Sequence, residues 1–151
     1  MQAVTIENPF TQVWNNIYEV ISTIPDPNAN RPENFKWIAS VFPEIDHSQK
    51  AYAFPFIVIN PVEITHDILT VGGKYMVECL VDIDIYSTKA AELDSLSDAV
   101  VKAMRDYRKS FRENNLYNME IENVTNSIVE IPNIHGRVKV RTLTYSFNYV
   151  G

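Results

Sequence analysis

Residues 75–87 read YMVECLVDIDIYS, and residues 88–111 continue as TKAAELDSLSDAVVKAMRDYRKSF. The first stretch alternates between two sets of side chains, which is the period of a β-strand. The apolar set consists of Tyr75, Val77, Cys79, Val81, Ile83 and Ile85. The second stretch repeats apolar residues at the spacing of an amphipathic helix. A long strand that leads directly into such a helix predicts a sheet with the helix packed on one face.

A second amphipathic helix is predicted near the start of the chain, over residues 10–24. Asn8 is a suitable N-cap, and Pro9 fits the first helical position, where its missing N–H costs nothing. Pro25 ends the pattern, because proline interrupts the backbone hydrogen bonds of a helix. The residues that follow, as far as Glu33, are too rich in proline and asparagine for a regular element. The later helix has Thr88 as its predicted cap and ends near residues 114–115.

Several other stretches have the composition of strands. They cover residues 35–42, 54–61, 62–70, 119–131 and 137–150. Residues 54–59 are apolar at every position. This predicts burial on both faces, with a partner subunit covering one of them. The apolar face of the last strand changes midway, and we expect a β-bulge near Arg141 and Thr142 to cause the change. Turns are expected at residues 72–73 and 132–136.

These elements define a fold class. Strands joined by tight turns are antiparallel, and two amphipathic helices must bury their apolar stripes against one sheet face. The sequence therefore predicts an α+β, two-layer sandwich with a mainly antiparallel sheet and two helices on one face. Its length of 151 residues fits a single domain over residues 1–151.

Composition limits the classes of partner. The net charge of -6 argues against tight binding of nucleic acid, which needs clustered lysine and arginine. Cys79 is the only cysteine, so a disulfide within the chain is impossible. The first residues do not resemble a signal peptide, and no apolar run is long enough to span a membrane. We expect a protein that is made in a reducing cytoplasm and has no membrane partner.

The sequence offers no constellation for catalysis. Cys79 lies on the apolar face of its strand and is expected to be a core thiol. The histidines, His47, His66 and His135, form no pair at metal-ligand spacing, and no glycine-rich phosphate loop is present. We therefore predict no enzyme, no catalytic residue, no metal site and no cofactor.

Two charged groups are candidates for a subunit interface or a channel lining. One consists of Glu78, Asp82 and Asp84, and the other consists of Arg105, Arg108 and Arg112, flanked by Lys102 and Lys109. The carboxylates share one face of a strand, where they either face solvent or pair across strands with Lys139 and Arg141. The basic residues lie in the second half of a helix. They form either a solvated face or a contact with an acidic neighbour, such as a second copy of the chain.

The order of elements resembles that of the tail terminator and tail completion proteins of long-tailed phages, including tail-to-head joining proteins. The resemblance is carried by an opening helix followed by a proline-rich loop, the apolar strand PFIVI (residues 55–59), the strand ending DIDIYS (residues 82–87) that runs into a helix, and the closing strand VRTLTYSFNY (residues 140–149). It covers most of the chain. It consists of a pattern of elements rather than residue signatures.

The resemblance implies a mechanical role in the virion, with assembly in the host cytoplasm. Such subunits form a homo-oligomeric ring, typically a hexamer, at the head-proximal end of the tail. The ring stops polymerisation of the tail tube protein and docks the head through a connector or neck protein. Genomic DNA passes through the lumen without specific binding. Two alternatives remain at this level: another neck or head-completion subunit, and a non-viral binding or accessory module.

Overall fold

The computed structural model describes residues 1–43, 45, 50–71, 74–131 and 136–150, without the side chains of residues 50–51, 66–71 and 74–75. The helices are α1 (Pro9–Ile21), α2 (Lys50–Ala53), α3 (Ala90–Asp106) and α4 (Arg108–Glu113). The strands are β1 (Ile38–Ala39), β2 (Phe56–Ile59), β3 (Glu63–Val71), β4 (Lys74–Ser87), β5 (Leu116–Val129) and β6 (Val138–Val150). They form one sheet in the order β1-β2-β4-β6-β5, with β3 paired to β4. Only the β1–β2 pair is parallel among the described strands.

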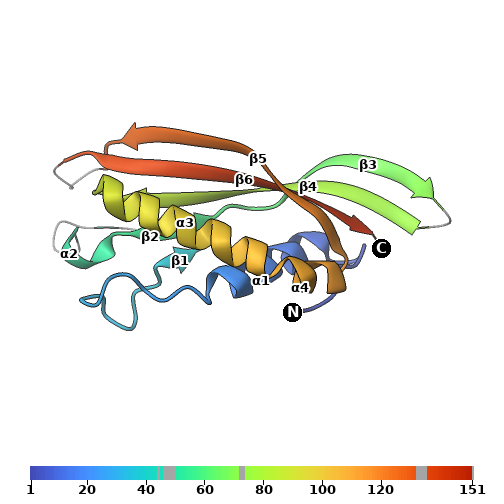
Figure 1. The fold of residues 1–151 in the computed structure, drawn as a ribbon, viewed down its shortest axis with the longest axis horizontal. Helices are drawn as coiled ribbons and strands as arrows, with labels where there is room; N and C mark the ends of the chain where they lie inside the picture. Colours follow the sequence, from blue (N-terminus) through green and yellow to red (C-terminus); the bar gives the residue numbers. More distant parts are fainter. Residues whose placement is uncertain (44, 46–49, 72–73, 132–135, 151) are drawn as a thin grey trace.

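Helices α1 and α3 bury their apolar stripes in one core with the sheet (Figure 1). The helices contribute Val13, Ile17, Val20, Ile21, Leu93, Leu96, Val100 and Met104, and strand β4 contributes Val77, Cys79, Val81, Ile83 and Ile85. Trp14 packs at the edge of this core and donates its indole N–H to the carbonyl oxygen of Ile59 at 2.9 Å. The predicted α+β fold with a mainly antiparallel sheet is confirmed. Within the described residues, every helix is too short or too polar to cross a membrane.

Strand β4 organises the sheet. One of its edges is shared by β2, which pairs with residues 83–86, and by β3, which pairs with the earlier part of the strand. Its other edge pairs with β6 without interruption from Met76 to Ser87. The β3–β4 hairpin extends past the helices in Figure 1. The expected turn at residues 72–73 lies outside the described residues.

The helix ends differ from those predicted. Helix α1 ends at Ile21 rather than Ile24, because the N–H groups of Thr23 and Ile24 bond in tighter turns to Val20 and Ile21. Asn8 is its N-cap residue and Pro9 its first residue, as predicted, although no side-chain hydrogen bond from Asn8 is present in this described segment.

The second predicted helix is broken in two. Tyr107 (φ −94°, ψ 10°) leaves the helical region between α3 and α4. The N-cap of α3 is Lys89, not Thr88. Ser87 supports this start, because its hydroxyl accepts the N–H of Lys89 at 3.1 Å and donates to Glu92 at 2.8 Å.

All four residues of β2 are buried, as predicted, but the chain itself covers the second face. Phe56 and Val58 lie in a second apolar cluster. Its other members are Ile45, Ala53, Phe54 and Val138, with Phe35, Trp37, Tyr86, Val129 and Ile131 at its border. The inference that a partner subunit covers this face was therefore wrong. The long connection before β2 has no periodicity, so its return over the sheet could not be read from the pattern.

The strand predicted at residues 35–42 is reduced to the two residues of β1. Its flanking aromatic residues make side-chain contacts instead of extending the ladder. Phe35 and Trp37 each lie 5.5 Å from the guanidinium of Arg31, measured from ring centroid to Cζ. Phe42 packs edge-on against Phe56 and Tyr86.

The bulge predicted near Arg141 and Thr142 is absent from the continuous β4–β6 register. The apolar face of β6 changes because different faces are covered at its two ends. Val138 belongs to the second cluster, whereas Leu143 and the later odd-numbered residues face the helices. The irregularities lie in β5 instead, where the register shifts between Tyr117 and Glu120 and again before Asn123.

Candidate functional site

The three candidate carboxylates lie on the face of the sheet opposite the helices. Glu78, Asp82 and Asp84 alternate with the buried residues of β4 and are paired in register with Asn148, Thr144 and Thr142 of β6. Asp82 is exposed, and the other two are half-buried. We call this surface the acidic sheet face. Between residues 76 and 86 of β4 and residues 140 and 150 of β6, no lysine or arginine shares it, because the only basic residue in these spans, Arg141, has the opposite parity.

Two of these carboxylates accept hydrogen bonds from neutral side chains and not from cationic ones. Thr144 donates its hydroxyl to Oδ1 of Asp82 at 2.5 Å, and Thr142 donates to Oδ1 of Asp84 at 2.5 Å. Asn60 donates its amide N–H to Oδ2 of Asp84 at 2.8 Å. Both aspartates thus keep their negative charge uncompensated by any ion pair among the described residues.

Of the two alternatives for the carboxylates, exposure to solvent and cross-strand pairing with Lys139 and Arg141, the pairing is contradicted for a geometrical reason. Lys139 is paired with Ser87 and Arg141 with Ile85, so both side chains point to the helix face. Arg141 there binds Asp94 of α3 at 2.8 Å and donates from Nε to Oδ1 of Asn126 at 2.8 Å. Arg141 thereby connects α3 to strands β5 and β6, and it forms no ion pair with the carboxylates of the acidic sheet face.

A cavity of about 480 Å³ opens beside the carboxylates. Its lining residues are Asn60, Pro61, Glu63, Leu80, Asp82 and Thr144. Glu63 adds a further carboxylate to this side of the molecule. Nevertheless, the described residues contain no group of three or more histidine, cysteine, aspartate or glutamate side chains placed to hold a metal ion. The chemistry available here is that of an anionic, hydrogen-bond-accepting surface.

The three candidate arginines lie in the helix layer. Arg105 belongs to α3, and Arg108 and Arg112 belong to α4; all three are exposed. None of them forms an ion pair with another described residue. Lys102 differs, because its Nζ lies 2.6 Å from Oδ2 of Asp106 and this hydrogen bond lowers the pKa of that carboxyl group. We call Arg105, Arg108 and Arg112 the basic helix face.

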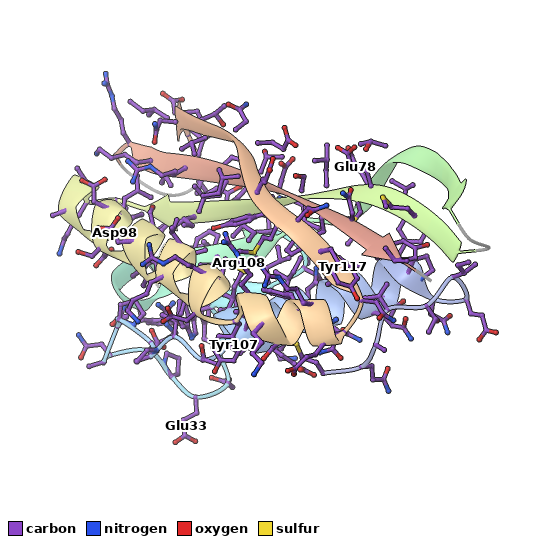
Figure 2. All side chains as sticks on the ribbon, turned by 45° about the vertical axis from the view of Figure 1, so that its right-hand side comes forward. Glu33, Glu78, Asp98, Tyr107, Arg108 and Tyr117 are labelled. Carbon is purple, nitrogen blue, oxygen red and sulfur yellow. The ribbon has the colours of Figure 1, made fainter. Side chains whose placement is uncertain are left out.

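The basic helix face borders a second cavity, of about 290 Å³, between α4 and β5. Arg108 and Arg112 line it together with Leu116, Asn118, Met119 and Glu120. Figure 2 shows Arg108 on the helix side of the molecule and Glu78 on the sheet side. The two candidate groups therefore lie on different sides of the molecule and do not meet within the chain.

Cys79 lies in the core, as its position in the alternation predicted. Only 1% of its surface is exposed, and its thiol donates to the carbonyl oxygen of Phe147 at 3.5 Å. Burial raises the pKa of this thiol to about 12, so the reactive thiolate is scarcely populated at neutral pH. His47 and His135 lie outside the described residues, as does the side chain of His66.

Sequence reasoning missed an apolar strip on β5. Ile121, Val124 and Ile128 are exposed, although they belong to the sheet face that carries the helices. They stand at positions i, i+3 and i+7, which is the spacing of a helix and not that of one strand face, because the register shift between Ile121 and Asn123 interrupts the strand alternation. The sequence does not say which strand lies at the sheet edge, so the available signal was the presence of these apolar residues in an otherwise mostly polar strand.

The chain is similar to proteins of one family. The sequence model of the family described as Tail completion protein gp17 matches residues 38–145, from the first strand into the last. Among solved structures, a chain of the "Virion of native gene transfer agent (GTA) particle" has a TM-score of 0.52 and 10% sequence identity, covering 76% of this chain and 79% of that chain. At this identity the likeness concerns the fold. No curated protein sequence matches the chain significantly.

Proposed function

The chain belongs to the family of Tail completion protein gp17, and from this premise we propose that it forms a ring at the head-proximal end of a virus tail. It is a structural tail protein of the virion. The ring stops polymerisation of the tail tube and provides the surface on which the head docks. The observation that carries the proposal is the family match over residues 38–145, which include the whole sheet except the end of β6.

The distribution of charge supports a head-to-tail ring. A contact of this type needs two different patches on each subunit, and it closes into a ring when the rotation between copies allows. The basic helix face lies in the helix layer, so any patch on the opposite side of the molecule is separate from it. Three exposed arginines without an intramolecular ion partner among the described residues favour a contact with an acidic neighbour. We assign Arg105, Arg108 and Arg112 to the contact between copies.

The acidic sheet face is assigned to the lumen. Asp82 and Asp84 are held by threonine hydroxyls, so they need no partner from another subunit. A wall that carries carboxylates and no arginine or lysine repels a polyanion at short range. Genomic DNA would then pass without specific binding. The tube protein would contact one rim of the ring and the head-tail connector the other, after assembly in the host cytoplasm, and the role needs no cofactor or catalytic group.

Electron cryomicroscopy of assembled particles tests the ring. We expect a closed ring of copies, in the hexameric arrangement the family resemblance implies, between the tail tube and the head. A single isolated copy at the neck would refute the proposal. Purified subunits are not decisive, because ring closure can require the tube end as a template.

Asp82→Lys tests the assignment of the two faces. With the carboxylates in the lumen, this variant should still form rings and attach heads, but DNA should be retained or released abnormally. If the carboxylates instead contact a neighbouring copy, Asp82→Lys should block ring formation, and a charge reversal at Arg105 or Arg108 should partly restore it. Glu33→Lys, at an exposed position in the connection before β1, is a control for the added charge.

A further inference from the structure

The helix layer covers the start of the edge strand β5, where Leu116 and Met119 are buried, but it does not extend over the rest of this strand. Ile121 is paired with Tyr145 and Val124 with Leu143, so all four side chains point to the same face. Tyr145 and Leu143 are 1% and 2% exposed beneath the helices, whereas Ile121, Val124 and Ile128 are 41%, 48% and 56% exposed. We call these three β5 residues the β5 strip. It is a continuation of the core face that this chain leaves uncovered.

The edge that carries the β5 strip is also poorly protected against association. Among the described strands, β5 pairs only with β6, and from Asn123 to Val129 the register is regular. Soluble proteins usually protect such an edge with lysine, proline or irregular geometry. Residues 116–129 contain no lysine, arginine or proline. A partner surface is the simplest way to remove this apolar area from water.

A complementary surface lies at the other edge of the sheet. Phe10, at the start of α1, is 52% exposed. It borders an apolar groove of about 490 Å³, whose lining residues are Phe10, Thr11, Trp14, Asn15, Ser40, Pro61 and Val62. These residues adjoin β1 and β2, which lie at the opposite end of the strand order from β5. One chain thus carries an uncovered sheet face at one edge and an exposed aromatic side chain beside an apolar groove at the other.

We propose that the α1 edge of a second copy of this chain, centred on Phe10, packs on the β5 strip. This inference rests on the proposed ring and identifies the apolar centre of its contact. The incoming α1 would lie beside α3 and extend the helix layer across the sheet. The contact joins two different edges, which is the head-to-tail geometry that a ring requires.

Charge favours this pairing over two alternatives. A contact between two β5 edges would bring Glu120, Glu122 and Glu130 close to the same residues of the partner, and like charges repel. A contact with the α1 edge centred on Phe10 instead brings the exposed Glu7 toward the basic helix face, which borders the beginning of β5. Glu19 is already paired with the N-terminal ammonium at 3.3 Å, so it is not assigned to this contact. Helix α1, from Pro9 to Ile21, contains no lysine, arginine or histidine, so it carries no positive charge that would repel the arginines.

Disulfide trapping in assembled particles tests the contact directly. In a Cys79→Ala background, the pair Phe10→Cys and Val124→Cys should give a ladder of covalently linked copies after mild oxidation. The matched control is Phe10→Cys with Thr125→Cys, because residue 125 is exposed on the same strand but faces the other side of the sheet. The control should give no ladder.

The outcomes separate this inference from the ring itself. Rings without cross-links would overturn the proposed contact and leave the ring standing. Dimers from Val124→Cys alone would indicate β5–β5 pairing, and cross-links to a tail tube subunit would indicate a different occupant; either result overturns the inference. Particles without any ring would overturn both proposals. Val124→Glu provides a second readout: it should prevent ring assembly in a folded subunit, while Thr125→Glu should not.

Discussion

Arg31 donates from Nε to both carboxylate oxygens of Asp26, at 2.8 and 3.1 Å, and so fixes the loop that covers the second face of β2. The remaining guanidinium nitrogens donate to the carbonyl oxygens of Tyr52, Ala53 and Pro55 at 2.6–3.1 Å. Only 2% of the Arg31 side chain is exposed. A planar group with several fixed donors can satisfy these four acceptor groups at once, which an ammonium group cannot.

Arg31→Ala should therefore lower the free energy of unfolding by roughly 1–3 kcal/mol, the range for leaving buried hydrogen-bond acceptors without a donor, because Asp26 itself is exposed to solvent. Arg31→Lys should recover only part of this loss. Urea denaturation followed by circular dichroism measures the change. Arg137→Ala, at an exposed position, is the control and should stay within about 0.5 kcal/mol of the parent protein. Equal effects of Arg31→Ala and Arg137→Ala would contradict the role of Arg31 in holding the loop.

Ile83 tests the packing of helices on sheet. It is fully buried in the main core, and Ile83→Ala should cost roughly 2–5 kcal/mol in unfolding free energy through lost burial and the cavity left behind. Ile128→Ala removes the same atoms from an exposed position and should change the stability of the free subunit by no more than about 0.5 kcal/mol. A small loss for Ile83→Ala would mean that the helices do not cover β4.

Cys79 should be dispensable for function. Cys79→Ala and Cys79→Ser should support normal particle assembly wherever the variants remain folded, because the thiol only fills the core. Since its pKa is raised to about 12, the native protein should also resist alkylation by iodoacetamide at pH 8 and react after unfolding in urea. Rapid alkylation of the native protein would show that the thiol is accessible.

Asn118 adopts a backbone conformation that few residues tolerate, with φ of 54° near the start of β5. Asn118→Val should destabilise the protein by roughly 1–2 kcal/mol, because a side chain branched at Cβ is unfavourable in the left-handed region. Asn118→Gly should be close to neutral. The control Asn123→Val lies in the regular part of the strand and should not destabilise. Thermal unfolding of the three variants provides the comparison.

The periodicity of a single segment predicted which of its own side chains are buried. The alternation of Val77 to Ile85 and the stripe from Leu93 to Met104 report directly which side chains are buried, and the structure confirms both. The burial of Phe56 by other residues of the same chain could not be predicted. It depends on where the preceding connection, which has no periodicity, folds back over the sheet.

The same distinction applies to the charged residues. Asp84 alternates with Ile83 and Ile85, whereas Arg141 has the parity of the apolar Leu143, so alternation within each strand already places the two charged residues on opposite faces. The pairing of Asp84 with Thr142 agrees with this. The change of face along β6 was interpreted as a bulge because a pattern cannot distinguish an inserted residue from a second covering layer. Arg31 gave no pattern at all: its partners are backbone carbonyls of distant residues, and these become neighbours only in the folded chain.

The central position of the last-synthesised strand, β6, has a consequence for biosynthesis. It lies between β4 and β5, yet it follows both in the chain, and β5 has no other partner strand among the described residues. A ribosome therefore exposes the core faces of β4, α3 and β5 before the strand that joins them has emerged. Nascent chains at this stage present apolar surface to chaperones and to one another. Docking of β6 is then the step that commits the new polypeptide to its native state, so premature termination before residue 138 should yield an unstable product rather than a smaller folded one.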